Sequence, residues 1–260
     1  MNDDQLVLWR TRARWFAAEF LVIVTGVLVA VALNGFYQKW QDGRSEASYL
    51  ALLSRDLQFT TRQLQEKIAF ETDQLNDGLM AYRALSAASR PANTAEVSAA
   101  LSKLSARRTL ALRAATYQDL LSTGNLRLIR NRQLRDQIVE YYGSTAAEYE
   151  IMNKNNSYFV DELYNSLVIG KGLVKPGTAS SNLASLSSVD AKLAPLLRPG
   201  YIDNADYLWS LPPGAPEWMQ LRSTLLMRIR ITAISEQYAQ QILQRTHALS
   251  TALGAEQADQ

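Results

Sequence analysis

The hydrophobic pattern of the chain begins with one uninterrupted apolar run, residues 15–36, WFAAEFLVIVTGVLVAVALNGF. Its single ionisable residue, Glu19, lies near the start of the run. As an α-helix, a run of this length extends roughly 33 Å, which is enough to cross the ~30 Å hydrocarbon core of a bilayer. Aromatic side chains of the kind that favour membrane interfaces flank the run: Trp9, Trp15, Phe36, Tyr37 and Trp40. The run therefore predicts a transmembrane helix.

A cleavable signal peptide is the alternative, because three arginines precede the run and Ala30-Val31-Ala32 has the form of a cleavage site. The small and polar residues of the run favour retention. Four of them form one narrow stripe on a helical wheel: Glu19, Gly26, Ala30 and Asn34. Gly26 and Ala30 allow a second helix to approach closely, with Glu19 and Asn34 available for hydrogen bonds. Alternatively, Glu19 and Asn34 only extend to the two interfaces.

Helical periodicity continues from about residue 40 to residue 89, where Arg90-Pro91 predicts the end of a long helix. A helix of this length reaches roughly 70 Å and must lie against partners. Gly43 is a predicted hinge between the anchor and this helix. The predicted core positions are Leu50, Leu53, Leu57, Leu64, Ile68, Leu75, Leu79, Tyr82 and Leu85.

Capping residues indicate three further helices. Asn93, with Glu96 three residues later, predicts the start of a short helix. Thr116 is the predicted cap of a brief helix that ends at Gly124-Asn125. Asn131 is the predicted cap of another long helix. The predicted core positions of that helix are Leu134, Ile138, Tyr141, Tyr142, Tyr149, Met152, Phe159, Leu163 and Leu167.

Residues 170–216 hold six of the seven prolines and a cluster of serines, and so predict a long connection with one short helix near residues 188–197. Pro216 then begins a last long helix, to about Leu253. Its predicted core positions are Trp218, Leu221, Leu225, Ile229, Ile234, Tyr238, Ile242 and Leu249. Because no alternating strand pattern persists, the predicted fold is all-α: a transmembrane helix followed by an elongated antiparallel bundle of three long and two to three short helices.

The corresponding domain organisation is a short N-terminal tail (residues 1–14), the transmembrane helix (15–36), a helical bundle domain (37–254) and a flexible tail (255–260). Three arginines precede the apolar run, whereas Lys39 and Arg44 follow it. This bias favours a single-pass protein of the inner membrane with its N-terminus inside and its C-terminal domain exported.

Two sequence blocks carry a family resemblance. The first joins Glu19, Gly26, Ala30 and Asn34 to Tyr49-Leu50-xx-Leu53-xx-Asp56, and the second is TYQDLLSTGNLRLIRNRQLRDQIVEYY, residues 116–142. Together they resemble a family of bacterial single-pass membrane proteins without an assigned function. Members usually have two Asn followed by Trp where this chain has Asn34-Gly35-Phe36. The resemblance implies a retained anchor and supplies no catalytic residues.

The charge of the whole chain is nearly balanced, with 27 basic and 25 acidic residues, which argues against a dedicated nucleic-acid-binding protein. Locally, seven arginines and only two aspartates lie between residues 105 and 136. These arginines either bind an anion or an acidic partner, or form salt bridges with acidic residues of the first long helix, such as Glu66, Glu71, Asp73 and Asp77. The candidate contact residues are Arg113, Asp119, Arg127, Arg130, Arg132 and Arg135.

The polar turn from Tyr117 to Arg127 has two interpretations as well. Its side chains either satisfy the backbone of a turn or line a ligand pocket in which Asp119 pairs with Arg127 or Arg130.

Catalytic and metal-binding motifs are missing from the sequence. There is no cysteine, and the only histidine, His247, is a predicted surface residue. Glu71 and Asp73 point about 200° apart on a helix and do not form a metal site. We therefore predict no catalytic residues, no metal and no cofactor. An enzyme acting at the membrane surface would need a carboxylate-based site that these residues do not assemble.

Two functions are consistent with these features. The first is a membrane-anchored, non-enzymatic helical module that assembles with itself or with another membrane protein. The second is an extracytoplasmic sensor bundle that binds a small anion and works with a separate output protein, because its inside tail is too short to act alone. Neither function involves nucleic acid.

Overall fold

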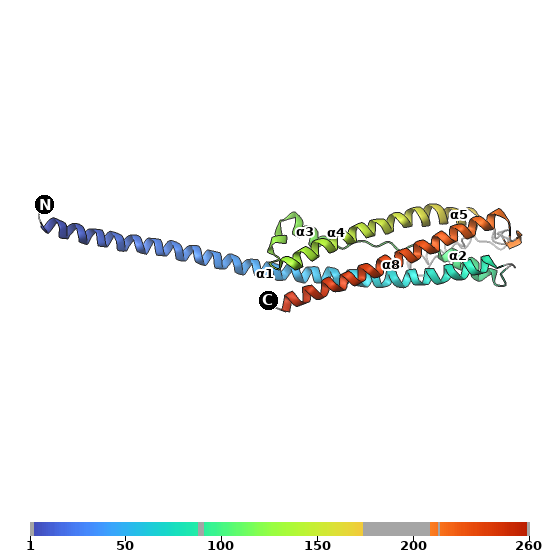
Figure 1. Ribbon diagram of the computed structural model, residues 1–260, viewed down its shortest axis with the longest axis horizontal. Helices are drawn as coiled ribbons and strands as arrows, with labels where there is room; N and C mark the ends of the chain where they lie inside the picture. The colour runs from blue at the N-terminus through green and yellow to red at the C-terminus, as the bar shows by residue number, and fades with distance from the viewer. Residues whose placement is uncertain (1–2, 88–90, 174–208, 213, 259–260) are drawn as a thin grey trace, which may run out of the picture.

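The computed structural model describes residues 3–87, 91–173, 209–212 and 214–258. Within these residues the regular structure is entirely helical, with no strand. Figure 1 shows a rod in which the first helix extends alone from one end and then continues into a bundle. The predicted all-α fold, with a long apolar N-terminal helix followed by an elongated antiparallel bundle, is confirmed.

The first helix, α1 (Asp3–Ser86), is continuous over 84 residues, or about 126 Å. Residues 3–14, assigned above to a tail, are thus part of the same helix. It is the one helix in the described chain that is long and apolar enough to cross a membrane, and other parts of the chain cover none of its apolar window. The helix does not break at Gly43, where a hinge was predicted. A Cβ there would lie 3.1 Å from Nη2 of Arg130, so Gly43 allows a close approach.

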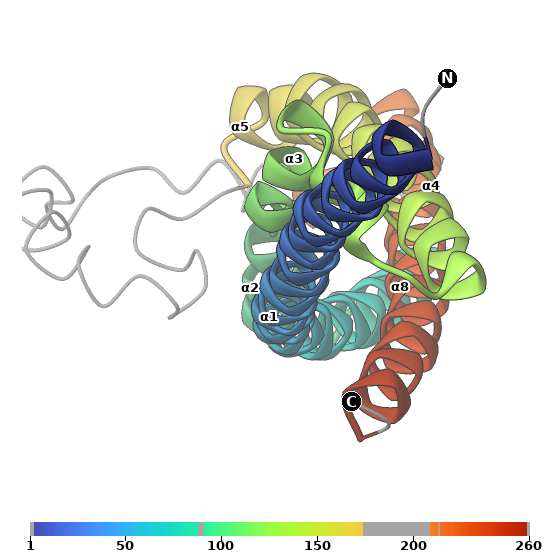
Figure 2. The ribbon, with the colours of Figure 1, turned by 90° about the vertical axis from the view of Figure 1, so that its left-hand side faces the viewer.

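After α1 the chain passes along the bundle three more times. From α2 (Thr94–Lys103) at the far end, residues 106–114, here called the strap, return without helical structure toward the end nearest the apolar run. There α3 (Ala115–Ser122) and η1 (Asn125–Leu128) form a compact turn. The chain then runs outward through α4 (Arg132–Asn155), η2 (Asn156–Asn165) and α5 (Ser166–Gly170), and back through α8 (Pro216–Ala258). Figure 2 shows the bundle end-on, with the N-terminal part of α1 toward the viewer.

The core is divided into three apolar clusters along the rod. The cluster nearest the apolar run includes Leu50, Leu53 and Ile138, and the middle cluster includes Leu64, Tyr149 and Ile242. The far cluster is the largest and includes the rings of Trp209 and Trp218, whose centroids are 5.4 Å apart. Burial of these apolar side chains is the main force that holds three long helices together.

Most predicted core positions are buried. Six positions of α1 and α8 are only partly buried: Ile68, Leu75, Leu79, Tyr82, Ile234 and Tyr238. The exceptions around η2 have a structural cause. Leu163 was predicted to be in the core, but it is 41% exposed, and Phe159 and Leu167 are only partly buried. Val160, Tyr164 and Val168 are buried instead. The reason is that η2 is a π-helix, whose wider turn moves the buried face by one residue relative to an α-helix.

The predicted caps are partly confirmed. Asn93 and Asn131 accept hydrogen bonds from the backbone N–H groups of Glu96 and Leu134, both at 3.1 Å. The predicted cap at Thr116 is wrong, because α3 begins at Ala115 and makes no side-chain cap. Helix α8 begins at Pro216 as predicted and continues to Ala258, so residues 255–258 are helical. The short helix predicted at residues 188–197 lies outside the described residues.

Candidate functional site

Polar side chains of α1 hold the turn formed by α3 and η1 at the end of the bundle nearest the apolar run. Glu46, Tyr49 and Asp56 are three and seven residues apart and therefore share one face of the helix. All three contact the segment 113–131. We call this set of contacts the clasp. It lies where α1 passes from the apolar run into the bundle (Figure 1).

Glu46 is the innermost residue of the clasp, with 1% of its surface exposed. Its Oε1 accepts the backbone N–H of Arg130 at 2.7 Å, and its Oε2 lies 3.4 Å from Nε of the same arginine. Nη2 of Arg130 also donates to the backbone carbonyl of Lys39 at 3.0 Å. A buried carboxylate must be paired and hydrogen-bonded to be tolerated, and Arg130 supplies both interactions.

Tyr49 is hydrogen-bonded to two residues of the turn. Its hydroxyl donates to Oδ2 of Asp119 at 2.8 Å and accepts Nδ2–H of Asn125 at 3.0 Å. The predicted pairing of Asp119 with Arg127 or Arg130 is therefore replaced by a hydrogen bond to Tyr49. Between Asp119 and Asn125 the backbone turns at Gly124, whose φ of 69° is in the left-handed region that glycine adopts without strain.

Asp56 completes the clasp. Its Oδ2 accepts the hydroxyl of Thr116 at 2.6 Å, which explains why Thr116 does not cap its own helix. Its Oδ1 lies 3.0 Å from Nε of Arg113. The Arg113 guanidinium also lies over the ring of Phe59, 4.7 Å from the centroid, an arrangement that favours a cation.

The other candidate arginines are spread around this end of the bundle. Arg132 lies 3.9 Å from Asp136, Arg135 donates to the carbonyl of Ile129 at 3.5 Å, and Arg127 is exposed. The structure thus brings Arg113, Asp119 and Arg130 into the clasp through three different residues of α1. It does not bring the six candidates together around one anion-sized space.

Acidic residues of α1 pair with basic residues of the α2–α3 region, as one interpretation predicted, but only in part. Glu66 pairs with Arg108, and Asp77 lies 3.3 Å from Nζ of Lys103. Glu71 instead pairs within α1, with Lys67 at 2.5 Å, and both side chains are at least 98% buried. Burial lowers the pKa of Lys67, while the neighbouring Glu71 carboxylate acts in the opposite direction.

A buried cation holds the start of the strap. Arg228 of α8 donates through Nε to the carbonyl of Leu104 at 2.9 Å and through Nη2 to the carbonyl of Ala106 at 3.0 Å. Lys67 donates to the carbonyl of Arg108 at 2.5 Å. Burial lowers the pKa of Arg228, and the charge of Glu71 opposes this effect. Three alternate carbonyls, of residues 104, 106 and 108, therefore face buried cations.

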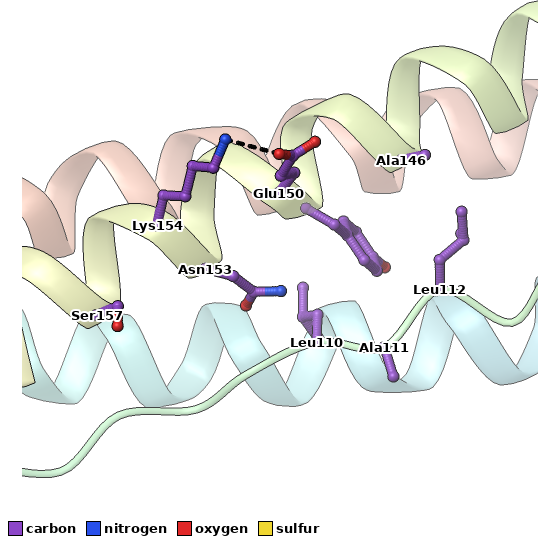
Figure 3. A pocket seen from close by; sticks show the side chains of 9 residues that line it. Leu110, Ala111, Leu112, Ala146, Glu150, Asn153, Lys154 and Ser157 are labelled. Atoms are coloured by element: carbon purple, nitrogen blue, oxygen red, sulfur yellow. Dashed lines mark ion pairs between the residues drawn. The ribbon is translucent and has the colours of Figure 1, made fainter.

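An open groove of about 590 Å³ lies between the strap and α4. Figure 3 shows Leu110, Ala111 and Leu112 of the strap on one side, with Ala146 and Asn153 of α4 opposite. The only charged side chains in its lining are Glu150 and Lys154, which pair with each other at 2.7 Å. Within the described residues no three His, Asp or Glu side chains lie close enough to hold a metal ion, and His247 is exposed on α8.

The fold and the clasp define a class of architecture: an apolar N-terminal helix that continues into an antiparallel helical bundle and is held to it by polar contacts at the end nearest the apolar run. No family model, curated protein or solved structure matches this chain.

Proposed function

We propose that the protein is a membrane-anchored, non-enzymatic helical module that associates, through its transmembrane helix, with a second copy or with another membrane protein. The observation that carries this proposal is the difference in burial between the bundle part and the apolar part of α1. The bundle part has a buried face along its length, whereas Glu19, Gly26, Ala30 and Asn34 are exposed. A Cβ added at Gly26 would meet nothing within 4 Å, so a second helix has room to approach.

The clasp supports the same function because it fixes the bundle to the anchor. α1 is helical from the apolar run into the bundle. Where α1 enters the bundle, Glu46, Tyr49 and Asp56 bind the turn formed by α3 and η1. A partner that binds the transmembrane helix would therefore hold the whole bundle in a defined orientation.

The proposed location is the bacterial inner membrane, with the N-terminus inside and the bundle exported. The three arginines before the apolar run, against Lys39 and Arg44 after it, support this topology, and the family resemblance supports a retained anchor. Because the chain has no cysteine, single-cysteine variants can test it. A membrane-impermeant maleimide should label Ser223→Cys, at an exposed position of α8, in cells whose outer membrane is permeabilised. It should label Gln5→Cys only after lysis. The reverse labelling would overturn the topology.

Association is tested by in-membrane cross-linking of an Ile23→Cys reporter. Ile23 falls within the stripe on a helical wheel. Adding Gly26→Leu and Asn34→Leu should reduce the cross-linked fraction several-fold, because bulky side chains separate the helices and the amide hydrogen bond is lost. The matched control adds Val24→Leu and Val31→Leu, which lie outside the stripe.

Three outcomes are informative. Reporter dimers that are lost only with the stripe substitutions would support self-association. A cross-link to a different membrane protein with the same dependence would support the heteromeric form. A cross-linked fraction that is equal in the stripe variant and its control would remove the anchor from the proposal.

A further inference from the structure

The strap has the geometry of an extended strand. Arg108 and Arg113 at its two ends contact Glu66 and Asp56 of α1. Residues 106–114 have no helical turn, and Figure 3 shows Leu110, Ala111 and Leu112 on an extended trace.

Side-chain burial along the strap has the period of a strand. Arg107, Thr109, Ala111 and Arg113 are exposed, whereas the four residues that follow them are buried or partly buried: Arg108, Leu110, Leu112 and Ala114. Period two is the signature of a strand with one covered face. Here the covered face lies on the bundle and the other faces outward.

No strand pairs with the strap within the described chain. Residues 107–113 form no backbone–backbone hydrogen bond, and the backbone partner they have is Lys67, which binds the carbonyl of Arg108. The N–H and C=O groups of adjacent residues in an extended chain point to opposite edges, and those of alternate residues point to the same edge. Since the carbonyls of residues 104, 106 and 108 point to buried cations, those of Thr109 and Ala111 point to the other edge.

The groove lies along that other edge. It is lined by Leu110, Ala111 and Leu112 of the strap and by residues of α4, and no residue of α1 takes part. Apolar strap and α4 side chains form its floor, and the paired Glu150 and Lys154 leave no unpaired charge in the lining.

We propose that the groove between the strap and α4 is a docking site for an extended peptide segment of a partner protein, which adds as a second strand along residues 107–113. An unpaired strand edge is a template for such addition, because main-chain hydrogen bonds supply affinity and an adjacent apolar groove selects side chains. The segment is uncharged where it crosses the groove and places an apolar side chain over Leu110 and Leu112. This inference rests on the proposed assembly function and names the kind of partner.

The strap is prepared for this role by its anchors. Arg228 and Lys67 hold its first half, and Asp56 holds Arg113 and Thr116 at its other end. A strand that is already extended and fixed at both ends loses little conformational freedom on pairing, which favours binding.

The test uses the full-length protein in nanodiscs and a displayed library of random decapeptides. Selected decapeptides are synthesised, and their affinities are measured by fluorescence anisotropy. Binding should slow amide exchange at residues 107–113 at least tenfold. Ala111→Pro removes one edge N–H without changing a buried side chain and should weaken binding at least tenfold, whereas Ala111→Ser should change it less than twofold.

A second pair of variants tests the groove without altering the strap. Ala146→Phe fills the groove from α4 and should weaken decapeptide binding at least tenfold. Ala147→Phe, one residue further and outside the lining, should have less than a twofold effect. This pair decides the question if Ala111→Pro fails to fold.

The proposal is overturned if no selected decapeptide protects residues 107–113, or if both Phe variants bind equally. Cross-linking of the Ile23→Cys reporter is measured in the same variants. Reporter dimers that persist while decapeptide binding is lost would leave association through the anchor intact, so failure of the groove is distinguishable from failure of the proposed function.

Discussion

Glu46 is the residue whose replacement tests the clasp most directly. Glu46→Ala leaves the backbone N–H of Arg130 without its acceptor and the Arg130 guanidinium without its carboxylate. A hydrogen bond to a charged group contributes about 1.5–3 kcal/mol, and an ion pair with a half-exposed arginine contributes about 0.2–1 kcal/mol. The expected local loss is therefore about 2–4 kcal/mol, which corresponds to a roughly 30-fold or greater increase in local opening.

Amide exchange measured by mass spectrometry on the full-length protein in detergent reports this opening. Peptides covering residues 125–135 should exchange at least 30-fold faster in Glu46→Ala, while peptides of the far cluster should be unchanged. Glu66→Ala is the matched control on the same helix. Its carboxylate is 58% exposed and pairs only with Arg108, so its local effect should stay below about 1 kcal/mol, or roughly fivefold.

Glu46→Gln separates the hydrogen bond from the charge. It keeps an oxygen that can accept the Arg130 N–H, so its effect should lie between wild type and Glu46→Ala. If Glu46→Ala and Glu66→Ala increase exchange equally, burial adds nothing to the Glu46 contact. The clasp would then not be what holds η1 to α1.

Two further predictions concern the bundle. A Cβ at Gly78 would lie 2.7 Å from Cγ1 of Ile229, whereas a Cβ at Gly143 meets nothing within 4 Å. Both alanine substitutions gain about 1 kcal/mol of helix propensity, but Gly78→Ala loses about 1–3 kcal/mol to overpacking. The Gly78→Ala protein should therefore melt at a lower temperature than the Gly143→Ala protein. Equal melting temperatures would contradict this packing. Burial raises the pKa of four tyrosines above the ordinary value of about 10: Tyr141, Tyr142, Tyr149 and Tyr164. Their contribution to stability is complete below pH 10 and is lost as pH rises above it, by about 1.4 kcal/mol per pH unit for each tyrosine, so urea unfolding midpoints should fall steeply from pH 10 to 11. The lowered pKa of Lys67 gives one opposing contribution, which ends near pH 10.5. The Tyr142 and Tyr149 hydroxyls have no hydrogen-bond partner in the described chain, so replacing both tyrosines with Phe should change the stability at pH 7 little. The same replacement should roughly halve the loss of stability per pH unit above pH 10. An unchanged loss would contradict the argument.

The helices follow from local signals in the sequence. Leucines spaced by three and four residues predict the buried face of α1, and Asn93 and Asn131 predict two helix starts, because a cap needs only the three residues that follow it. The register of η2 has no such signal. Because its turns are π-helical, a count at 3.6 residues per turn leads to Leu163 rather than Tyr164.

The clasp and the strap are less predictable, because they depend on residues far apart in the chain. Glu46 occupies a core position, but the sequence does not show whether a glutamate is hydrogen-bonded to water or to Arg130. The alternation of polar and apolar residues in the strap is interrupted at Ala111, whose outward side chain is as small and apolar as that of a core residue. Its extension comes from contacts with Lys67 and Arg228, which lie 41 and 122 residues away from their partners in the strap.

The continuity of α1 also restricts how two copies can meet. Counted at about 100° per residue, Glu46, Leu53 and Leu57 lie roughly opposite Gly26, Ala30 and Asn34, so the bundle is on the far side of α1 from the stripe. In a dimer through the stripe, the two α1 helices would therefore face each other with the side that points away from the bundle. Arg55 of each copy lies on that side.

The angle at which the two α1 helices cross decides whether these arginines come close to each other. At the roughly 40° crossing of small-residue contacts, two helices that cross at Ala30 are about 25 Å apart at Arg55, some 37 Å further along. Like charges at that separation are largely screened, since it exceeds a Debye length of about 8 Å. We therefore expect Ile23→Cys to cross-link and Arg55→Cys not to. Equal cross-linking at both positions would mean that the copies run side by side along the bundle, and would contradict a contact confined to the membrane.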